Sequence, residues 1–271
     1  MLTPEGILAK LADSDSFTIL FWRGIFFALS ILIILFISYR SRAFNEIKSI
    51  GKEGILIGCL TGLGGATFIL AIHYTTLAKT LVIISASPLM VALVSFFLLK
   101  EKPKLFTWLA MVVVFFGIYI VMSGDTSGLN LKGSLLALVS VTTGGFSFTL
   151  LRKYKEVNMV PAMAINGLFI TTVGLLFAES LVLTSQAMTF IIISSILVAI
   201  SFTLITIAPQ YIPAPEVAIF FPMGTVIGTL LAWLIHKEEL SNNAIFGGVV
   251  VILTLFIHSI YSARQSKNER L

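Results

Sequence analysis

Long apolar segments alternate with short polar loops along the whole chain. Nine segments of about 20 residues are apolar on all sides, and they cover residues 17–39, 54–74, 80–99, 105–123, 133–151, 160–183, 189–208, 217–235 and 244–262. A helix of about 20 residues crosses the ~30 Å hydrocarbon core of a bilayer, whereas barrel strands would show alternating polarity over about ten residues. The pattern therefore predicts an all-α integral membrane protein with nine transmembrane helices.

Composition agrees with this class and excludes several others. Hydrophobic residues make up 57% of the 271 residues, charged residues 11%, and the mean hydropathy is +1.02; a soluble domain is about 25% charged. The net charge of +5 lies in short runs between apolar segments rather than on a nucleic-acid-binding surface. Cys59 is the single cysteine, which excludes an intrachain disulfide or a cysteine metal cluster.

The positive residues predict the orientation in the membrane. Thirteen of the 18 Lys and Arg residues lie in one set of loops, for example Arg40, Lys100 and Arg152, and four lie in the opposite set. Positive loops stay on the cytoplasmic side. We therefore expect a multi-pass protein of the cell inner (plasma) membrane with a cytoplasmic C-terminus.

The chain shows an internal duplication. A shift of 143 residues sets Arg23-Gly24 over Asn166-Gly167, and a shift of 137 residues sets Lys100-Glu101 over Lys237-Glu238. The shift contains five spans, so the copies would lie in opposite orientations, as in secondary transporters whose site is near the membrane midplane. We predict a first, N-terminally incomplete repeat at 1–123 and a second, inverted repeat at 124–271. The alternative is that two polytopic stretches look alike at low identity.

The duplication also predicts an absent element. The span 133–151 should have a partner that ends near Lys10, yet only nine residues precede Lys10. Eleven helical residues reach about 16 Å and cannot cross the membrane. We expect that most of a first helix is missing, through truncation or a misplaced start; the alternative is nine spans with an external N-terminus.

Three stretches carry a resemblance to a known family. They are Phe21-Trp22-Arg23-Gly24; Ser85-Ala86-Ser87-Pro88 followed by Leu98-Leu99-Lys100-Glu101-Lys102; and Ala208-Pro209-Gln210-Tyr211-Ile212-Pro213-Ala214 running through Phe221-Pro222 to His236-Lys237-Glu238. The chain resembles the EamA-type transporters of the drug/metabolite transporter superfamily. The resemblance implies a ten-helix bundle of two inverted repeats that moves small metabolites, such as amino acids or their derivatives, by alternating access. The chain departs from the family in lacking most of the first helix.

The charged and titratable residues inside the spans are candidates for two roles, which are contact with substrate or a gate and proton coupling. Arg23 is the one basic residue well inside a span, and a charge there is a functional hypothesis by default; we expect a contact with substrate or a gate, or else an anchor at the outer interface. Glu179 and His73, near outer span ends, are the proton-coupling candidates. Their alternative is contact with outer water or the interface.

Prolines within the spans supply the remaining candidates. Proline leaves backbone carbonyls unpaired, and in transporters such breaks often line cavities. Together with Arg23, the predicted substrate-binding residues are Ser85, Ser87, Pro88, Gln210, Phe221, Pro222 and Thr225. No P-loop, metal-protease or nucleophile motif occurs in the sequence, so we expect neither an enzyme nor a catalytic residue, metal or cofactor.

The sequence thus predicts a secondary transporter, an exporter or exchanger of a small organic metabolite across the cytoplasmic membrane. The alternative is a non-transporting truncated paralogue or a membrane assembly partner, and an intramembrane enzyme is a third hypothesis. The expected partners are a small-molecule substrate and the lipid bilayer, without nucleic acid, and a homodimer is left open.

Overall fold

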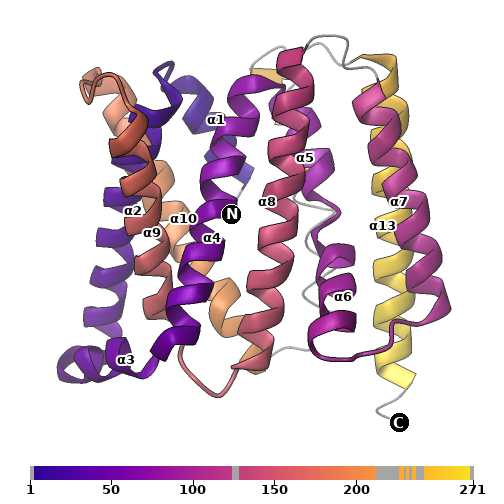
Figure 1. Ribbon diagram of the computed structural model, residues 1–271, viewed down its shortest axis with the longest axis horizontal. Coiled ribbons are helices and arrows are strands. Elements are labelled where there is room, and N and C mark those ends of the chain that lie inside the picture. Colours follow the sequence, from indigo (N-terminus) through magenta and orange to yellow (C-terminus); the bar gives the residue numbers. More distant parts are fainter. Residues whose placement is uncertain are drawn as a thin grey trace.

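A computed structural model describes the backbone of residues 3–123, 128–211, 226–228, 230–231, 234–235 and 241–268. All regular elements in these residues are helices (Figure 1). They are α1 (Thr3–Leu11), α2 (Ser16–Tyr39), the 3-10 turn η1 (Arg40–Arg42), α3 (Ala43–Ser49), α4 (Gly51–Tyr74), α5 (Leu77–Ile84), α6 (Ser87–Leu98), α7 (Leu105–Ser123), α8 (Gly128–Lys153), α9 (Val160–Phe177), α10 (Ser185–Tyr211) and α13 (Asn242–Asn268).

The described helices confirm the predicted all-α membrane fold. Within the described residues, eight helical segments are long and apolar enough to cross a membrane. They match eight of the nine predicted spans, and the ninth, 217–235, lies almost entirely outside the described residues. Two predicted spans differ in detail, because 80–99 is broken into α5 and α6, and the span predicted to end at residue 183 ends at Phe177.

Polar side chains cap the N-terminal ends of α2 and α5 and so set where these two helices begin. The Asp15 carboxylate accepts hydrogen bonds from the backbone N–H groups of Phe17 and Thr18, at 3.0 Å each, and so caps α2. The Thr76 hydroxyl accepts a bond from the N–H of Lys79 in the first turn of α5. The cap at Asp15 sets Arg23 about two turns inside α2.

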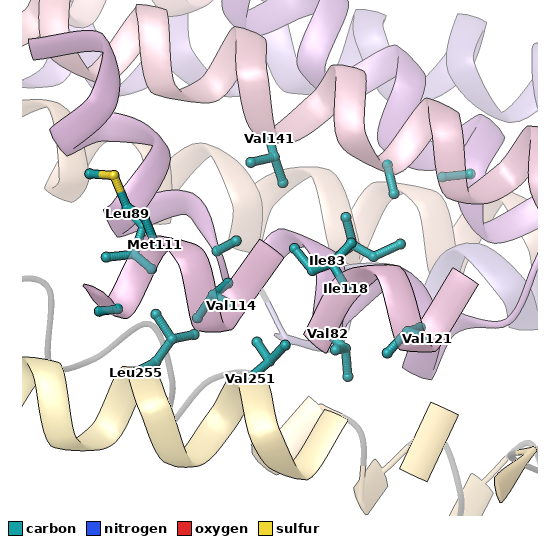
Figure 2. Close-up of a cluster of buried hydrophobic side chains, with 14 residues drawn as sticks. Val82, Ile83, Leu89, Met111, Val114, Ile118, Val121, Val141, Val251 and Leu255 are labelled. Atoms are coloured by element: carbon teal, nitrogen blue, oxygen red, sulfur yellow. The ribbon is translucent and has the colours of Figure 1, made fainter. Parts of the chain in front are cut away.

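The buried side chains form three clusters. The first joins α1 to one end of α2, α4, α9 and α10, and the second joins α3 to the other end of the same four helices. The third fills the space between α5, α6, α7, α8 and α13, where Val114 of α7 and Val251 of α13 lie close together (Figure 2). Lipid-facing residues such as Ile37 and Phe116 stay exposed, as a bilayer solvent requires.

The two ends of the bundle differ in charge. The end that carries α3 and the α6–α7 connection holds Arg40, Lys100 and Arg152 (Figure 1), and we call it the basic end. Two polar contacts join connections there: Arg152 pairs with Glu101 at 3.0 Å, and the Asn158 amide donates to the Glu46 carboxylate at 2.9 Å. The α1–α2 and α4–α5 connections lie at the other end, which we call the outer end after the orientation predicted from the basic loops.

Helices α2 and α9 cross at a pair of glycines. A Cβ atom built on Gly24 would lie 2.6 Å from the carbonyl oxygen of Gly167, and one built on Gly167 would lie 2.8 Å from the carbonyl oxygen of Gly24. Neither position has room for a side chain, so the two backbones can touch only because both residues are glycine.

Gly24 and Gly167 are also the residues that the 143-residue shift superimposes. An antiparallel helix pair has a local two-fold axis of its own, so reciprocal contacts alone carry little information. The presence of a glycine at the matched position of each helix is not required by this symmetry, and it agrees with the predicted duplication. Helices α7 and α13 cross in the same manner, with a Cβ on Gly247 2.6 Å from the carbonyl oxygen of Gly117.

Candidate functional site

A buried ion pair lies inside the bundle. Arg23 of α2 is 4% exposed and Glu5 of α1 is 5% exposed, and the guanidinium Nη2 donates to the Glu5 Oε1. Charges in the hydrocarbon layer are costly, and they face the protein interior and pair with one another. The sequence analysis identified Arg23 but missed its partner.

Helix α1 brings Glu5 to this position. It starts near mid-height in the bundle and runs to the outer end, where α2 begins (Figure 1). Its buried residues Ile7 and Ala9 pack in the cluster shared with α4 and α10. A Cβ on Gly6 would clash with the side chain of Leu77, so α1 also lies close against the start of α5.

The guanidinium keeps unused donors. Nε and Nη1 of Arg23 are buried and have no hydrogen-bond partner among the described residues. A Cβ on the neighbouring Gly65 of α4 would lie 3.4 Å from Nη1, so the guanidinium lies against a backbone surface. Burying donors without acceptors costs free energy. The arrangement therefore offers two strong, directed donors to any acceptor that reaches them.

A second buried polar group lies across the α2–α9 crossing. Asn166 of α9 is 2% exposed, and its Oδ1 has no partner among the described residues. The 143-residue shift places it over Arg23. Each side of the α2–α9 crossing thus carries one buried polar side chain beside its glycine.

An outer pocket of about 300 Å³ lies on the outer side of the ion pair. Its lining residues are Ala9, Lys10, Asp13, Ser14, Ser16, Ile19, Ile69, Ile72 and His73. Three of these residues lie one helical turn outward from the residues just described: Ala9 follows Glu5 on α1, Ile19 precedes Arg23 on α2, and Ile69 follows Gly65 on α4. The apolar part of the pocket wall therefore stands about 6 Å from the level of the ion pair.

Charged and polar groups line the same pocket. The lining includes the basic side chain of Lys10, the acidic side chain of Asp13 and the imidazole of His73. His73 itself is exposed. Its ring lies edge-on to Tyr74, with the centroids 5.2 Å apart. His73, predicted as a proton-coupling residue, thus faces the outer pocket, and its role stays a prediction.

Glu179 lies outside the helix in which it was predicted. Helix α9 ends at Phe177, and Glu179 is exposed in the connection that follows. Two hydrogen bonds hold this connection against α2: the Thr18 hydroxyl donates to the carbonyl oxygen of Ser180 at 2.5 Å, and the Trp22 indole N–H donates to that of Leu181 at 2.8 Å. These bonds explain why the chain leaves the helical path before residue 183.

Ser85, Ser87 and Pro88 lie at the break between α5 and α6. Pro88 has no N–H group to donate to the carbonyl of Ile84, and the Ser87 hydroxyl donates to that carbonyl instead, at 2.5 Å. The Ser85 hydroxyl donates to the carbonyl of Val82 at 2.6 Å. Both serine hydroxyls therefore donate to backbone carbonyls at the break between α5 and α6 in this conformation. Their contact with substrate stays a prediction.

The remaining predicted site residues are not described. Gln210 belongs to the last turn of α10, but its side chain lies outside the described residues, and Phe221, Pro222 and Thr225 lie outside them altogether. Among the described residues, no group of three or more His, Cys, Asp and Glu side chains is placed to hold a metal ion.

Comparisons with known proteins identify relatives along most of the chain. An uncharacterized transporter of Methanothermobacter thermautotrophicus is 22% identical over 73% of this chain and 58% of its own length, so the chain spans little more than half of that relative. The uncharacterized transporter YoaV of Bacillus subtilis is 21% identical over 88% of this chain and 85% of its own. An S-adenosylmethionine uptake transporter of Rickettsia prowazekii is 22% identical over 94% of this chain and 86% of its own.

Structural and family comparisons agree. A solved crystal structure superimposes with a TM-score of 0.70 over 97% of this chain and 95% of the other chain, at 15% identity, and supports the fold. The profile of the EamA-like transporter family matches residues 5–123 and again residues 131–260. The chain therefore belongs to the EamA-like transporter family, as the resemblance predicted.

Proposed function

We propose that this membrane transporter is a secondary transporter that moves a small organic solute across the cytoplasmic membrane by alternating access. The observation that carries the proposal is the buried Glu5–Arg23 pair beneath the outer pocket. A cation held inside the span region, with two donors unpaired and a pocket about one turn away, is typical of a solute pathway and unnecessary for packing.

The proposed moving parts are two inverted repeats, 1–123 and 124–271. Support comes from the two separate matches to the family profile and from the glycine crossings of α2 with α9 and of α7 with α13. Because glycines have no side chains to interdigitate, each crossing is a small contact between two helix backbones. One repeat can tilt against the other about such a contact. Alternating access in such transporters is largely rocking of one repeat against the other around a fixed site.

The charge distribution supports an orientation. We propose that the basic end faces the cytoplasm, because it carries most of the Lys and Arg residues. The buried cluster that includes Ala43 of α3 and Val160 of α9 closes that end over α2, α4 and α10, while the pocket lies at the outer end. In this orientation the described pocket faces the outside.

The proposed solute is an amino acid or an amino-acid derivative, exported or exchanged. The relative named as an S-adenosylmethionine uptake transporter supports a solute of this chemistry. Glu5, Lys10 and Asp13 supply charges of both signs along the path from the pocket to the ion pair, which suits a zwitterion.

Solute counterflow in proteoliposomes tests the proposal. Vesicles containing the full chain are loaded with one unlabelled amino acid or S-adenosylmethionine and diluted into the labelled form, with and without a pH gradient. Transient accumulation of label above the level in protein-free vesicles is the expected result. Absence of counterflow for every solute in the panel would contradict transport and favour the assembly-partner alternative.

A further inference from the structure

We propose that Arg23 is the receptor for a carboxylate group of the solute, and that Glu5 occupies this receptor as an internal substitute until the solute displaces it. The inference rests on the proposed function and names the chemical group that the site recognises. Three observations carry it: the unpaired donors of Arg23, the single bond to Glu5, and the position of the pocket.

The pairing of Arg23 with Glu5 uses a small part of what the guanidinium offers. Arginine has five N–H donors in a planar fork that matches a carboxylate through two parallel bonds. In this structure one donor atom, Nη2, meets one carboxylate oxygen, while Nε and Nη1 are buried without a partner among the described residues. A second carboxylate, or a rearranged one, can therefore gain bonds that Glu5 does not make.

The unpaired donors lie one helical turn inward from the wall of the outer pocket. The pocket wall residues Ile19 and Ile69 each stand one turn outward from Arg23 and Gly65. Gly65 presents no side chain to the guanidinium, and its Cβ position is 3.4 Å from Nη1. A solute in the pocket therefore has one apolar layer of about 6 Å to pass before its carboxylate reaches these donors.

Glu5 is carried by a short helix. Helix α1 has nine residues and is anchored on α4, α5 and α10 mainly by small or medium side chains such as Ile7 and Ala9. A buried charge must keep a partner of opposite sign, so displacement of Glu5 requires that the incoming group be an anion. This requirement selects carboxylates over their neutral amides.

The test compares carboxylates with matched amides on the full chain in detergent. L-alanine, L-lactate and succinate are titrated against L-alaninamide, lactamide and succinamide, with inorganic phosphate as a further anion, and affinity is read from the shift of thermal unfolding. The variants are Glu5→Gln, Arg23→Gln and the double variant Glu5→Gln/Arg23→Gln. Arg152→Gln is the control, because it removes an arginine from the part-exposed ion pair at the basic end.

The expected result is that at least one carboxylate stabilises the wild type and its amide does not. Glu5→Gln should bind that carboxylate about tenfold more tightly, because a charged competitor is gone. The double variant should unfold cooperatively and show no carboxylate preference, which separates recognition from folding if Arg23→Gln alone fails to fold. Arg152→Gln should keep the wild-type preference.

Four outcomes would overturn the inference. They are equal binding of acids and amides, binding of phosphate in place of carboxylates, no gain in affinity in Glu5→Gln, and a carboxylate preference that survives in the double variant. Counterflow of a neutral or cationic solute together with any of these outcomes would leave the proposed function standing. Failure of counterflow for all solutes would instead overturn the proposed function itself.

Discussion

Three consecutive residues of α2 serve three different neighbours. The indole of Trp22 donates to the α9–α10 connection, Arg23 pairs with Glu5 of α1, and Gly24 lets α9 approach. Successive helical residues point about 100° apart, so three adjacent positions can face three different partners.

The glycine crossing makes a direct prediction at Gly24. Gly24→Ala should lower the free energy of unfolding by about 1–3 kcal/mol, because the new Cβ would meet the backbone of Thr171 and Gly167. Gly144→Ala is the matched control on α8, since no atom lies within 4 Å of its Cβ position, and it should be neutral or slightly stabilising. Thermal unfolding in detergent measures both, and equal effects would contradict the close crossing.

At the residue level, the sequence singled out Arg23 as a charge inside a span, with a role that stays a prediction, and it did not single out its partner Glu5. A cation inside an apolar span is conspicuous, because such charges are rare. Glu5 lies in a stretch too short to span, which the sequence predicts to be the remainder of an incomplete first helix, and the sequence does not show what this stretch packs against. Only the packing of α1 on α4 and α10 reveals that this carboxylate enters the bundle.

At the scale of elements, helix ends depend on hydrogen bonds that a hydropathy pattern does not contain. The apolar run of α9 continues toward residue 183, but Thr18 and Trp22 bind the carbonyls of Ser180 and Leu181 and remove this segment from the helix. Similarly, the predicted span 80–99 is continuous in hydropathy, yet Pro88 divides it into α5 and α6. The existence of each described span and the break at Pro88 were predictable from the sequence, whereas the early end of α9 depends on the folded neighbours.

The break between α5 and α6 predicts a coupling between Ser87 and Pro88. Ser87→Ala should cost about 1 kcal/mol of unfolding free energy, since the carbonyl of Ile84 loses its donor. In a Pro88→Ala background the cost should vanish, because the new N–H can serve the same carbonyl. A double-mutant cycle by thermal unfolding measures this; equal costs in both backgrounds would show that Ser87 does not compensate for the proline. Ser123→Ala, at an exposed helix end, is the control.

At the scale of the whole molecule, the contacts that hold the bundle together run largely between the two proposed repeats. Helix α2 packs on α9, α4 packs on α8 and α9, and α7 packs on α13. The sequence predicted the family, which the comparisons confirm, and a duplication, which stays a prediction and rests on matched span lengths and loop motifs along the chain. It could not predict that matched glycines would meet, which depends on how the repeats associate.

Separate expression of the two repeats tests this architecture. Residues 1–123 and 124–271, produced as two chains in one cell, should assemble and copurify, because apolar and glycine-mediated faces remain exposed on each half alone. The Gly24→Ala change should weaken copurification, and Gly144→Ala should not. Stable, monodisperse halves that do not associate would contradict the interlocked arrangement.

The measurement that tests the central claim most directly is two-sided labelling of single cysteines during transport. In a Cys59→Ser background, Ile72→Cys reports on the outer pocket and Val160→Cys, in the first turn of α9, reports on the buried cluster at the basic end. Reaction with a membrane-impermeant maleimide, added from either side with and without the solute found by counterflow, gives the accessibility of each end. Alternating access predicts that the solute changes the two labelling rates in opposite directions. Rates that change together, or that do not respond to a solute the protein moves, would contradict it.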